Sequence, residues 1–530
     1  MSPGSGDTGP GRPDPVHHLT LPGVLSEHRR SRPHSLSLVC GGVRLTYSEL
    51  DDRTDRLARA FVGAGVGRGD RVVWLGQNCH RLIEAWLAAS KVGAVVVPAN
   101  WRQSADEMVT LLEDALPVVV IWQHEEIGAT VEEARSRWGG TARWLSHDAV
   151  GDPDGYETFV AAAGEAGEAG EATVPLHRSV SPAEPVLQLY TGAFGGTPNG
   201  AQLSHRSILA QAVMVAMVQR ITGETVYLNS GPMFHMATLM TTFATFQMGG
   251  TNVLTRRVEA DELCRVIEAE RCNYGFVMGP TAAEIMTVNA DGRYDLSSFR
   301  TFGGSPAWNR MIDVDDSPWG LHPAGYGQTE VTGMLTFNAL GIGTEGTSGR
   351  PSPWVEVRIV DPDGADVPTG ETGEIVARGP IITNGYHDRP QLNAERFRGG
   401  WWHTGDLGRR HPDGSLTFVA PLTRIVKSAA ENIYPAEVEG CLAQHPAVRE
   451  AAIVGVPDKR WTQRVLAVVV LEPGAEVTGE DLIEHCRARI ASYKKPSLVE
   501  FADKLPRKGW AVDYEELDRR YGGGGYPGTA

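Results

Sequence analysis

Apolar runs alternate with amphipathic segments along much of the chain. RVVWLG at 71–76 and GAVVVPAN at 93–100 have the β-branched content of buried strands. Between them, RLIEAWLAASK at 81–91 places Leu82 and Trp86 on one face of a helix. Strand, helix and strand in this order predict a βαβ unit, and therefore a parallel sheet covered by helices.

The pattern changes towards the C-terminus. From residue 353, WVEVRIVD and GEIVARG alternate apolar and polar positions, which predicts a small antiparallel β region. After about residue 423, the segments VREAAIVG, VLAVVVLEP and GEDLIEHCRARIASY predict a compact α+β domain. Four further strands of the parallel part are expected at 118–122, 186–190, 252–255 and 274–279.

Low-complexity segments mark both ends of the chain and one interior position. Gly, Pro and Ser dominate residues 1–20 and Gly dominates 522–530, so disordered or flexible tails are expected there. The Ala/Gly/Glu-rich stretch 161–183 predicts an exposed linker or insertion. The resulting division is a large N-terminal domain at 21–422, a hinge at 423–427 and a small C-terminal domain at 428–521.

Charge and composition exclude several classes of partner and location. The formal net charge is -16 and no basic run occurs, so no nucleic acid partner is expected. No apolar run reaches the ~18 residues of a membrane span. The N-terminus lacks the apolar core of a secretory signal, so a cytoplasmic location is expected. The six cysteines show no disulfide or zinc spacing and are interpreted as buried thiols.

The segment QLYTGAFGGTPNGAQLSH at 188–205 places a glycine-rich loop directly after a predicted strand. Backbone N–H groups of such a loop can bind phosphate. The same glycines could equally form a tight turn, so this segment alone leaves both interpretations open.

Three further segments, taken with the first, carry a resemblance to a known family. YGQTE at 326–330, WWHTGDLGRRHPDGSL at 401–416 and KSAAENIYPAEVE at 427–439 follow in order. Together they resemble the adenylate-forming superfamily, which contains acyl-CoA synthetases, peptide-synthetase adenylation domains and luciferases. Segments at 45–73, 231–237, 445–461 and 492–496 also fit, so the resemblance spans nearly the whole chain.

The resemblance implies both a fold and a reaction. The expected fold is α/β, with a large N-terminal domain of parallel α/β subdomains and a small β region, then a small mobile α+β C-terminal domain. In the family, a carboxylate attacks the α-phosphate of ATP to give an acyl-adenylate, and a thiol then displaces AMP. The small domain rotates about a hinge between the two steps.

The resemblance also implies roles for individual residues. Asp406 would accept both ribose hydroxyls, because a carboxylate is an acceptor-only group. Glu330 would be the catalytic and Mg²⁺-binding carboxylate, His235 the gate of the acyl site, and Lys427 the loop lysine that faces the site during thioester formation. Taken alone, Asp406 could cap a turn, His235 could be a core histidine and Glu330 a solvated carboxylate. The remaining positions that the resemblance assigns to nucleotide binding are Gly303, Gly304, Ser305, Tyr326, Gly327 and Thr329.

The phosphate loop departs from the family pattern Thr-Ser-Gly-Thr-Thr-Gly-x-Pro-Lys-Gly. Gly192, Phe194 and Gly195 replace hydroxyl residues, and Asn199 replaces the lysine. A charge-assisted hydrogen bond contributes roughly 1.5 to 3 kcal/mol, so two such losses would weaken triphosphate binding on the order of a hundredfold or more.

The C-terminal domain departs as well. Ala511 and Val512 lie where the family has its adenylation lysine, and Lys508 upstream is either a substitute or a solvated surface lysine. The hinge Gly-Arg-x-Lys-Asp becomes Ala420, Pro421, Leu422, Thr423 and Arg424, with proline restricting rotation. The Gly-Gly turn beside the thiol channel becomes Ala429 and Ala430.

Three hypotheses follow. The first is a ligase-like enzyme with impaired ATP-dependent adenylation that performs acyl transfer, condensation or cyclisation in a biosynthetic, secondary-metabolite pathway. It would bind AMP or an acyl-adenylate, take a small acyl substrate on CoA or a carrier protein, and dispense with ordinary use of ATP and Mg²⁺. The second is a working acyl- or aryl-CoA ligase in which Lys508 or Arg424 replaces the missing lysines. The third is a non-catalytic homologue with a binding or regulatory role.

Overall fold

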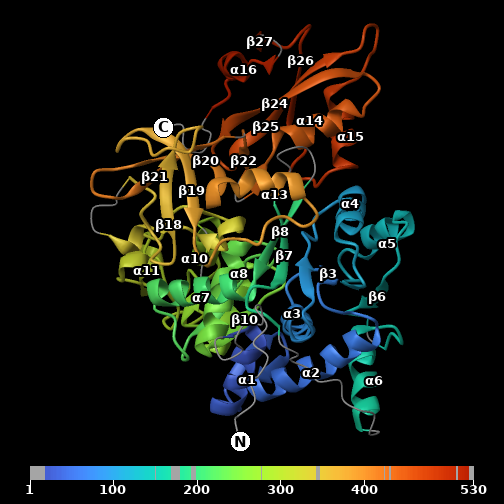
Figure 1. Ribbon diagram of the computed structural model, residues 1–530, viewed down its shortest axis with the longest axis vertical. Coiled ribbons are helices and arrows are strands. Elements are labelled where there is room, and N and C mark those ends of the chain that lie inside the picture. Colours follow the sequence, from blue (N-terminus) through green and yellow to red (C-terminus); the bar gives the residue numbers. More distant parts are fainter. Residues whose placement is uncertain are drawn as a thin grey trace, which may run out of the picture.

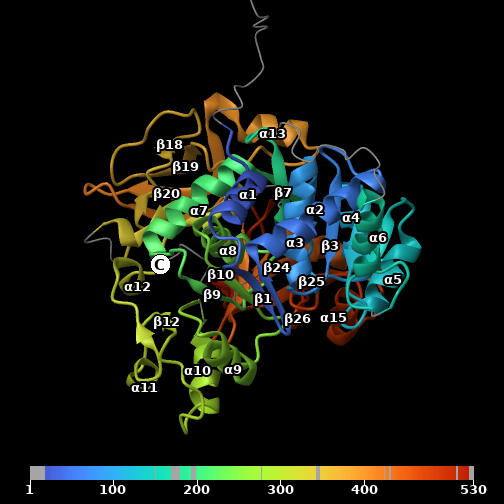
Figure 2. The same cartoon turned by 90° about the horizontal axis from the view of Figure 1, so that it is seen from below.

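Two mostly parallel sheets form the core of the large N-terminal part (Figures 1 and 2). The computed structural model describes residues 18–149, 151–168, 180–191, 198–275, 277, 279–341, 346–422, 424–428, 431–508 and 511–524. The six-stranded sheet has the order β6 (Arg143–Ser146), β5 (Val119–Trp122), β3 (Arg71–Leu75), β4 (Val95–Pro98), β7 (Pro185–Thr191), β8 (Asn199–Ser204). The five-stranded sheet has the order β11 (Tyr274–Gly275), β9 (Val226–Asn229), β10 (Thr251–Leu254), β1 (Leu36–Cys40), β2 (Val43–Thr46).

The predicted βαβ unit is confirmed. Strands β3 and β4 pair in parallel, and α3 (His80–Val92) connects them. All four residues of β4 are buried, as the continuous apolar run requires when helices cover both faces of a sheet. The expected strands at 118–122, 186–190 and 252–255 correspond to β5, β7 and β10.

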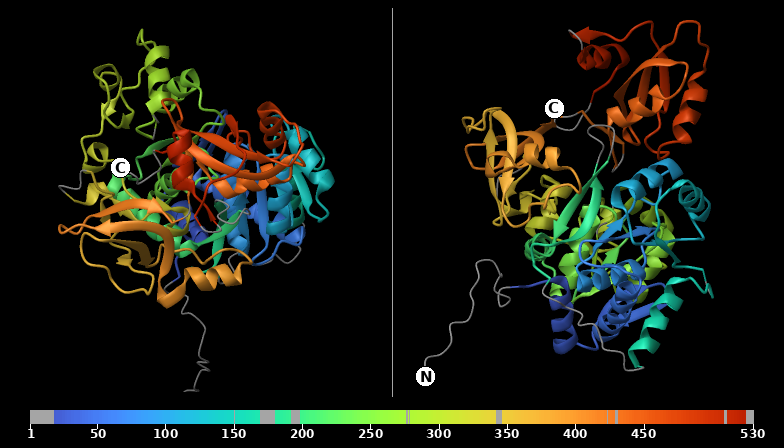
Figure 3. Two further views of the ribbon diagram at one scale, coloured as in Figure 1. Left: turned by 90° about the horizontal axis from the view of Figure 1, so that it is seen from above. Right: turned by 45° about the vertical axis from the view of Figure 1, so that its right-hand side comes forward.

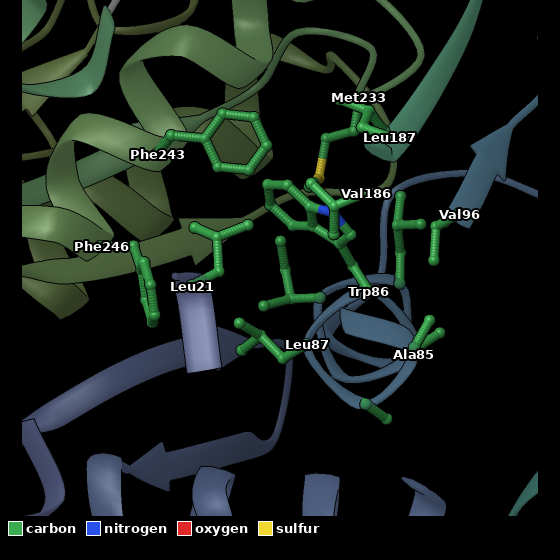
Figure 4. Packing of buried hydrophobic residues seen from close by; sticks show 14 of the residues in the cluster. Leu21, Ala85, Trp86, Leu87, Val96, Val186, Leu187, Met233, Phe243 and Phe246 are labelled. Carbon is green, nitrogen blue, oxygen red and sulfur yellow. The ribbon is translucent and has the colours of Figure 1, made fainter. Parts of the chain in front are cut away.

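Helix α3 packs against strands of both sheets and joins their cores. Trp86 on α3 meets Phe243 on α8 (Met236–Met248), with ring centroids 3.8 Å apart (Figure 4). Both side chains are at least 95% buried. The other long helices of this part are α1 (Leu21–Ser31), α2 (Tyr47–Gly63), α4 (Ala105–Ala115), α5 (Gly128–Arg137), α6 (Tyr156–Glu168), α7 (His205–Gln219), α9 (Ala260–Glu270) and α10 (Gly279–Val288).

The antiparallel β region is also confirmed. It is a four-stranded sheet of β18 (Glu356–Val360), β19 (Thr372–Arg378), β20 (Trp402–Arg410) and β21 (Leu416–Pro421), paired in chain order. Strand β20 carries the HTGD segment, so this sheet places Asp406.

The small C-terminal domain is built around one mixed sheet (Figure 3). Alternate residues of β25 (Thr462–Leu471) bury opposite faces: Val465 and Ala467 pack with α14 (Pro435–Ala443) and α15 (Gly479–Arg487), whereas Leu466 and Val468 pack with α16 (Tyr514–Tyr521). This period of two is the geometry of a strand that is buried on both sides. The domain's elements are β22 (Val426–Ser428), β23 (Glu431–Ile433), α14 (Pro435–Ala443), β24 (Val448–Asp458), β25 (Thr462–Leu471), α15 (Gly479–Arg487), β26 (Leu498–Phe501), β27 (Arg507–Lys508), β28 (Ala511–Val512) and α16 (Tyr514–Tyr521).

Several boundaries differ from those expected. Residues 161–168 of the expected linker continue helix α6, because the alanines and glutamates favour a helix enough to accommodate Gly164 and Gly167. The expected strand at 274–279 is a strand only at Tyr274–Gly275, and α10 begins at Gly279. Gly524 does not belong to a free tail, since its N–H donates to the Gly455 carbonyl at 3.0 Å.

Other expectations lie wholly or partly outside the described residues. These include the tails at 1–17 and 525–530, the linker residues 169–179, the phosphate-loop residues 192–197, and positions 429 and 430. The later hinge residues 426 and 427 already belong to strand β22 of the small domain. Among the described residues, no helix has both the length and the apolar character that crossing a membrane requires.

Cysteine burial follows the prediction with one exception. Cys79, Cys264, Cys272, Cys441 and Cys486 are buried, whereas Cys40 is half-buried. Potential ligand atoms of Cys40, Cys79 and His80 lie within 4.8 Å of one another, although Cys40 is remote from the other two in sequence.

Candidate active site

A cavity of about 480 Å³ lies between the large N-terminal part and the small C-terminal domain. In Figure 1 the small domain stands above the sheet that contains β7 and β8. Ala99 follows β4 and Thr191 ends β7, and both line the cavity. The cavity is therefore at the carboxyl ends of parallel strands, where ligands of open α/β sheets bind.

Tyr326 and Asp406 form a hydrogen-bonded pair on the cavity wall. The Tyr326 hydroxyl donates to Oδ2 of Asp406 at 2.6 Å, and Nε2 of Gln328 donates to the same oxygen at 3.1 Å. The indole N–H of Trp402 donates to Oε1 of Gln328, which fixes the orientation of the amide. The Tyr326 ring stacks on Phe418 at 5.4 Å and 11°. Two segments distant in sequence are thereby joined at a single carboxylate.

Burial raises the pKa of Asp406 to about 6, although the hydrogen bond from Tyr326 opposes the shift. The nearby charge of Glu330 raises this pKa further, whereas Gln328 and Arg396 lower it. At neutral pH the group is still mainly ionised, and it can accept hydrogen bonds from a diol. Below about pH 6 it gains a proton and loses part of that capacity.

A narrow turn places Gly327 and Thr329 on the cavity wall. Strand β14 (Gly327–Gln328) pairs with β15 (Gly333–Met334), and a Cβ atom on Gly327 would meet the Gly333 carbonyl oxygen at 1.9 Å. Only glycine fits this approach. Thr329 begins the short 3-10 helix Thr329–Val331, which also carries Glu330.

Glu330 is 4% exposed and is held by two hydroxyl groups. Thr191 donates to its Oε1 at 3.1 Å, and Tyr386 donates to the same oxygen at 2.7 Å. Both of these bonds use one carboxylate oxygen, which orients the group and directs the remaining ligand capacity to Oε2. A buried, oriented carboxylate fits a hard divalent cation such as Mg²⁺.

His235 contacts a residue of the small domain. Its Nε2 lies 3.3 Å from Oε2 of Glu431, within ion-pair distance but without hydrogen-bond alignment. Burial alone would raise the pKa of Glu431, but His235 and the positive charges of Arg102 and Lys494 outweigh it, and the net shift is downward. Glu431 is therefore a stable anion that faces the predicted acyl gate.

Lys427 also reaches the cavity from the small domain. Its backbone N–H donates to Oε1 of Gln463 at 2.7 Å, which fixes strand β22, while the residue itself is exposed. In this arrangement the small domain presents Lys427, Glu431 and Asn432 to the site.

The structure does not bring Gly303, Gly304 and Ser305 to the cavity. All three are exposed and none lines it. The Ser305 hydroxyl instead accepts the Trp308 N–H at 3.2 Å as the N-cap of the short helix Pro306–Asn309. In this Gly-Gly-Ser turn, the serine caps the following helix. The expected contact of the turn with a purine stays a prediction.

The residues that replace family positions have structural roles. Asn199 is 7% exposed, and its Oδ1 accepts a bond from Nε of Arg389 at 3.2 Å. Arg424 pairs with Asp518 of α16 at 2.5 Å, so it does not face the cavity in this arrangement. Val512 packs against the α16 side of the small domain and does not line the cavity. Pro421 does line it.

Sequence comparisons identify the family of the chain. The family described as AMP-binding enzyme matches residues 25–387, and the family described as the AMP-binding enzyme C-terminal domain matches 437–509. The chain belongs to the AMP-binding enzyme family. The predicted resemblance, the fold class and the assignment as an enzyme are confirmed.

Relatives of this AMP-binding enzyme are acid–thiol ligases. A feruloyl-CoA synthase of an Amycolatopsis species is 35% identical over 508 residues, 93% of this chain and 98% of that protein. An indoleacetate–CoA ligase of Aromatoleum aromaticum is 32% identical over 478 residues, 87% and 90% of the two chains. A fatty acid–[acyl-carrier-protein] ligase of Streptomyces coeruleorubidus is 30% identical over 531 residues, 96% and 98% of the two.

Solved structures show the same fold. The o-succinylbenzoate CoA synthetase of Bacillus subtilis matches with a TM-score of 0.77 at 24% identity, covering 94% of this chain and 98% of that one. An amide bond synthetase of Marinactinospora thermotolerans also matches at 0.77 and 24%, covering 95% and 99%. At this identity the likeness concerns the fold. None of these comparisons supports the expectation that the AMP-binding enzyme dispenses with ATP and Mg²⁺.

Two residues at the site were not predicted from the sequence, Glu431 on the cavity wall and Tyr386 behind Glu330. Glu431 lies inside the segment used for the resemblance, but its contact with His235 crosses the domain boundary and has no local signal. Tyr386 does not line the cavity itself and belongs to none of the family motifs, and only the fold brings its buried hydroxyl to Glu330.

Proposed function

We propose that the chain is an ATP-dependent acid–thiol ligase that converts a carboxylic acid to a thioester through an acyl-adenylate. The observation that carries this proposal is the single cavity in which Asp406 and Glu330 face Lys427 and Glu431 of the small domain. The first pair suits a nucleotide and its cation, and the second suits the thiol step.

The large N-terminal part would bind the nucleotide. Asp406, supported by Tyr326 and Gln328, would accept the ribose hydroxyls. Thr329 would donate its hydroxyl to the α-phosphate. Glu330 would hold Mg²⁺, which when bound neutralises phosphate charge.

The small domain would serve the thiol step. Displacement of AMP from an acyl-adenylate requires a thiolate to attack the acyl carbon while the phosphate oxygen leaves with its electron pair. Lys427 would stabilise the charge of the leaving phosphate, and Glu431 would hold His235 away from the acyl carbon.

The substrate class we propose is an aromatic or arylalkyl carboxylic acid. Two of the relatives act, by name, on ferulate and indoleacetate. Phe234 and Leu111 add apolar surface to the cavity wall. CoA is the proposed acceptor, and a carrier protein is the alternative suggested by the acyl-carrier-protein ligase among the relatives.

The test is direct. The protein is incubated with ATP, Mg²⁺ and CoA together with ferulate, indoleacetate or a medium-chain fatty acid, and AMP, pyrophosphate and acyl-CoA are quantified. Equal amounts of AMP and thioester with an aromatic acid are expected. Absence of AMP with every acid would contradict the proposal.

A second candidate is acyl transfer from a preformed acyl-adenylate or thioester. The observation that favours it is Asn199, which lies at the family's lysine position and whose side-chain oxygen binds Arg389. A synthetic acyl-adenylate then gives product with CoA, while acid plus ATP gives none. If both routes give product at equal rates, this candidate is wrong.

A further inference from the structure

A buried lysine joins the small C-terminal domain to the large N-terminal part at the edge of the cavity. Nζ of Lys494 donates to Oε1 of Glu107 and to Oε1 of Glu437, each at 2.6 Å. Glu107 belongs to α4 of the large part, whereas Lys494 and Glu437 belong to the small domain. The side chains of all three are about 10% exposed. We name these three residues the Lys494 bridge.

We propose that Lys494 is a positioning residue that holds the small domain in the arrangement where Lys427 and Glu431 face the cavity. The proposal rests on the proposed function, because it concerns the second half-reaction. Lys494 would act by docking the domain, without contact to the reacting atoms.

The charges of the bridge explain why the lysine is needed. Without Lys494, the carboxylates of Glu107 and Glu437 would face each other across the boundary and repel. Burial raises the pKa of Glu437, although Lys494 opposes that shift, which indicates a poorly hydrated cluster. In such surroundings a charge pair interacts more strongly than on an open surface.

Glu107 links the bridge to the local structure of α4. Its Oε2 accepts the Ser104 N–H at 2.9 Å in a capping box, while Oε1 receives Lys494. The Ser104 hydroxyl in turn donates to the Arg489 carbonyl of the small domain at 2.6 Å. Glu107 thus both caps the first turn of α4 and binds Lys494, so the first turn of α4 is where the small domain docks.

Other contacts between the large N-terminal part and the small domain lie beside the Lys494 bridge. Arg102 lies 3.5 Å from Oε1 of Glu431, and Asn100 donates to the Tyr493 hydroxyl at 3.3 Å. Residues 100–107 therefore form a continuous docking segment, and the Lys494 bridge is the buried charged contact within it. If the small domain rotates between half-reactions, as the family resemblance implies, this contact must break and form again.

Glu107→Gln is the decisive variant. Glutamine keeps the capping box but presents a neutral amide to Lys494, and Lys494 retains Glu437 within its own domain. Folding of both parts should therefore be preserved while the contact across the boundary is lost. Glu113→Gln is the matched control, because Glu113 is an exposed glutamate of the same helix.

Two half-reactions are measured on the full chain: pyrophosphate release from acid and ATP, and single-turnover thioester formation from synthetic acyl-adenylate and CoA. Glu107→Gln is expected to slow thioester formation about tenfold or more, equivalent to ~1.4 kcal/mol, with pyrophosphate release retained. Lys494→Met should slow the same step, and the double variant should be no slower than the slower single one, because both changes break one contact.

Small-angle X-ray scattering provides a readout that does not depend on activity. Glu107→Gln should increase the radius of gyration relative to Glu113→Gln, because the docked arrangement loses population. Equal scattering and equal thioester rates in the two variants would overturn the proposal. So would an equal loss of both half-reactions with a lowered melting temperature, since that indicates a general structural role. If wild-type protein forms no thioester by either route, the proposed function fails and scattering alone decides the bridge.

Discussion

Asp406 offers a sharp test of the nucleotide site, because its charge changes within an accessible pH range. The perturbation is Asp406→Asn, which keeps the shape of the side chain and its backbone setting in β20. The substitution removes one full acceptor oxygen and the negative charge. Binding of AMP should weaken, because the ribose hydroxyls lose a charged acceptor.

The magnitude follows from the contacts around Asp406. A hydrogen bond to a charged group contributes roughly 1.5–3 kcal/mol, so AMP affinity at pH 8 should fall about 10- to 100-fold. With a pKa of about 6, the wild-type carboxylate is roughly 99% ionised at pH 8 and roughly 10% ionised at pH 5. Wild-type affinity should therefore approach that of the variant as the pH falls.

The assay is titration calorimetry of AMP with both proteins at pH 5, 6, 7 and 8. The phosphate of AMP titrates in the same range, so the ratio of wild-type to variant affinity is the informative quantity. That ratio should narrow by roughly tenfold between pH 8 and pH 5. A constant ratio would refute the assignment of Asp406 as the titrating ribose acceptor. Asp363→Asn, in an exposed turn, is the control and should bind like wild type.

Three further predictions follow. Glu330→Gln should lower the rate of pyrophosphate release about 10²- to 10³-fold, and an unchanged rate would contradict its role in binding the cation. Tyr386→Phe should lower the same rate less, about tenfold, because it removes one of the two hydroxyl bonds to Glu330. Lys427→Ala should slow thioester formation from acyl-adenylate about tenfold more than it slows pyrophosphate release, and the reverse order in stopped-flow traces would argue against its role in the thiol step. Phe243→Ala should reduce the free energy of unfolding, measured in urea, by about 3–5 kcal/mol, because the ring is 1% exposed and packs on Trp86. In the control Val213→Ala, at an exposed position of α7, the free energy of unfolding should stay within about 0.5 kcal/mol of the wild-type value. An equally small loss for Phe243→Ala would show that the surrounding side chains collapse into the space.

Local pattern sufficed for most secondary structure, because burial and periodicity act over a few residues. The apolar run at 95–98 became a strand buried at every position, and alternation within β25 supplied both faces of the small domain. The predicted element boundaries were wrong where neighbouring residues or tertiary contacts determined the local conformation. Residues 161–168 are helical despite their low complexity, and Gly524 is tied to Gly455 despite lying in a glycine run.

The site was predictable in part. Tyr326, Gly327, Thr329, Glu330 and Asp406 were placed by motif resemblance, and the fold gathers all of them around one cavity. Gly303, Gly304 and Ser305 were placed by the same reasoning but lie outside it. A motif identifies residue types and their order along the chain. The direction in which those residues point depends on the neighbouring structure, here the helix that Ser305 caps.

The sequence by itself determined the family and the succession of a parallel α/β part, an antiparallel sheet and a small α+β domain, because these depend on periodicity and on ordered motifs. It also supplied the candidate site residues by type and order. Tertiary structure alone decided which charges meet. Lys494 and Glu107 are 387 positions apart, and His235 meets Glu431 across a domain boundary. No local sequence pattern predicts such pairs, because their interaction depends on distance and burial in the folded chain.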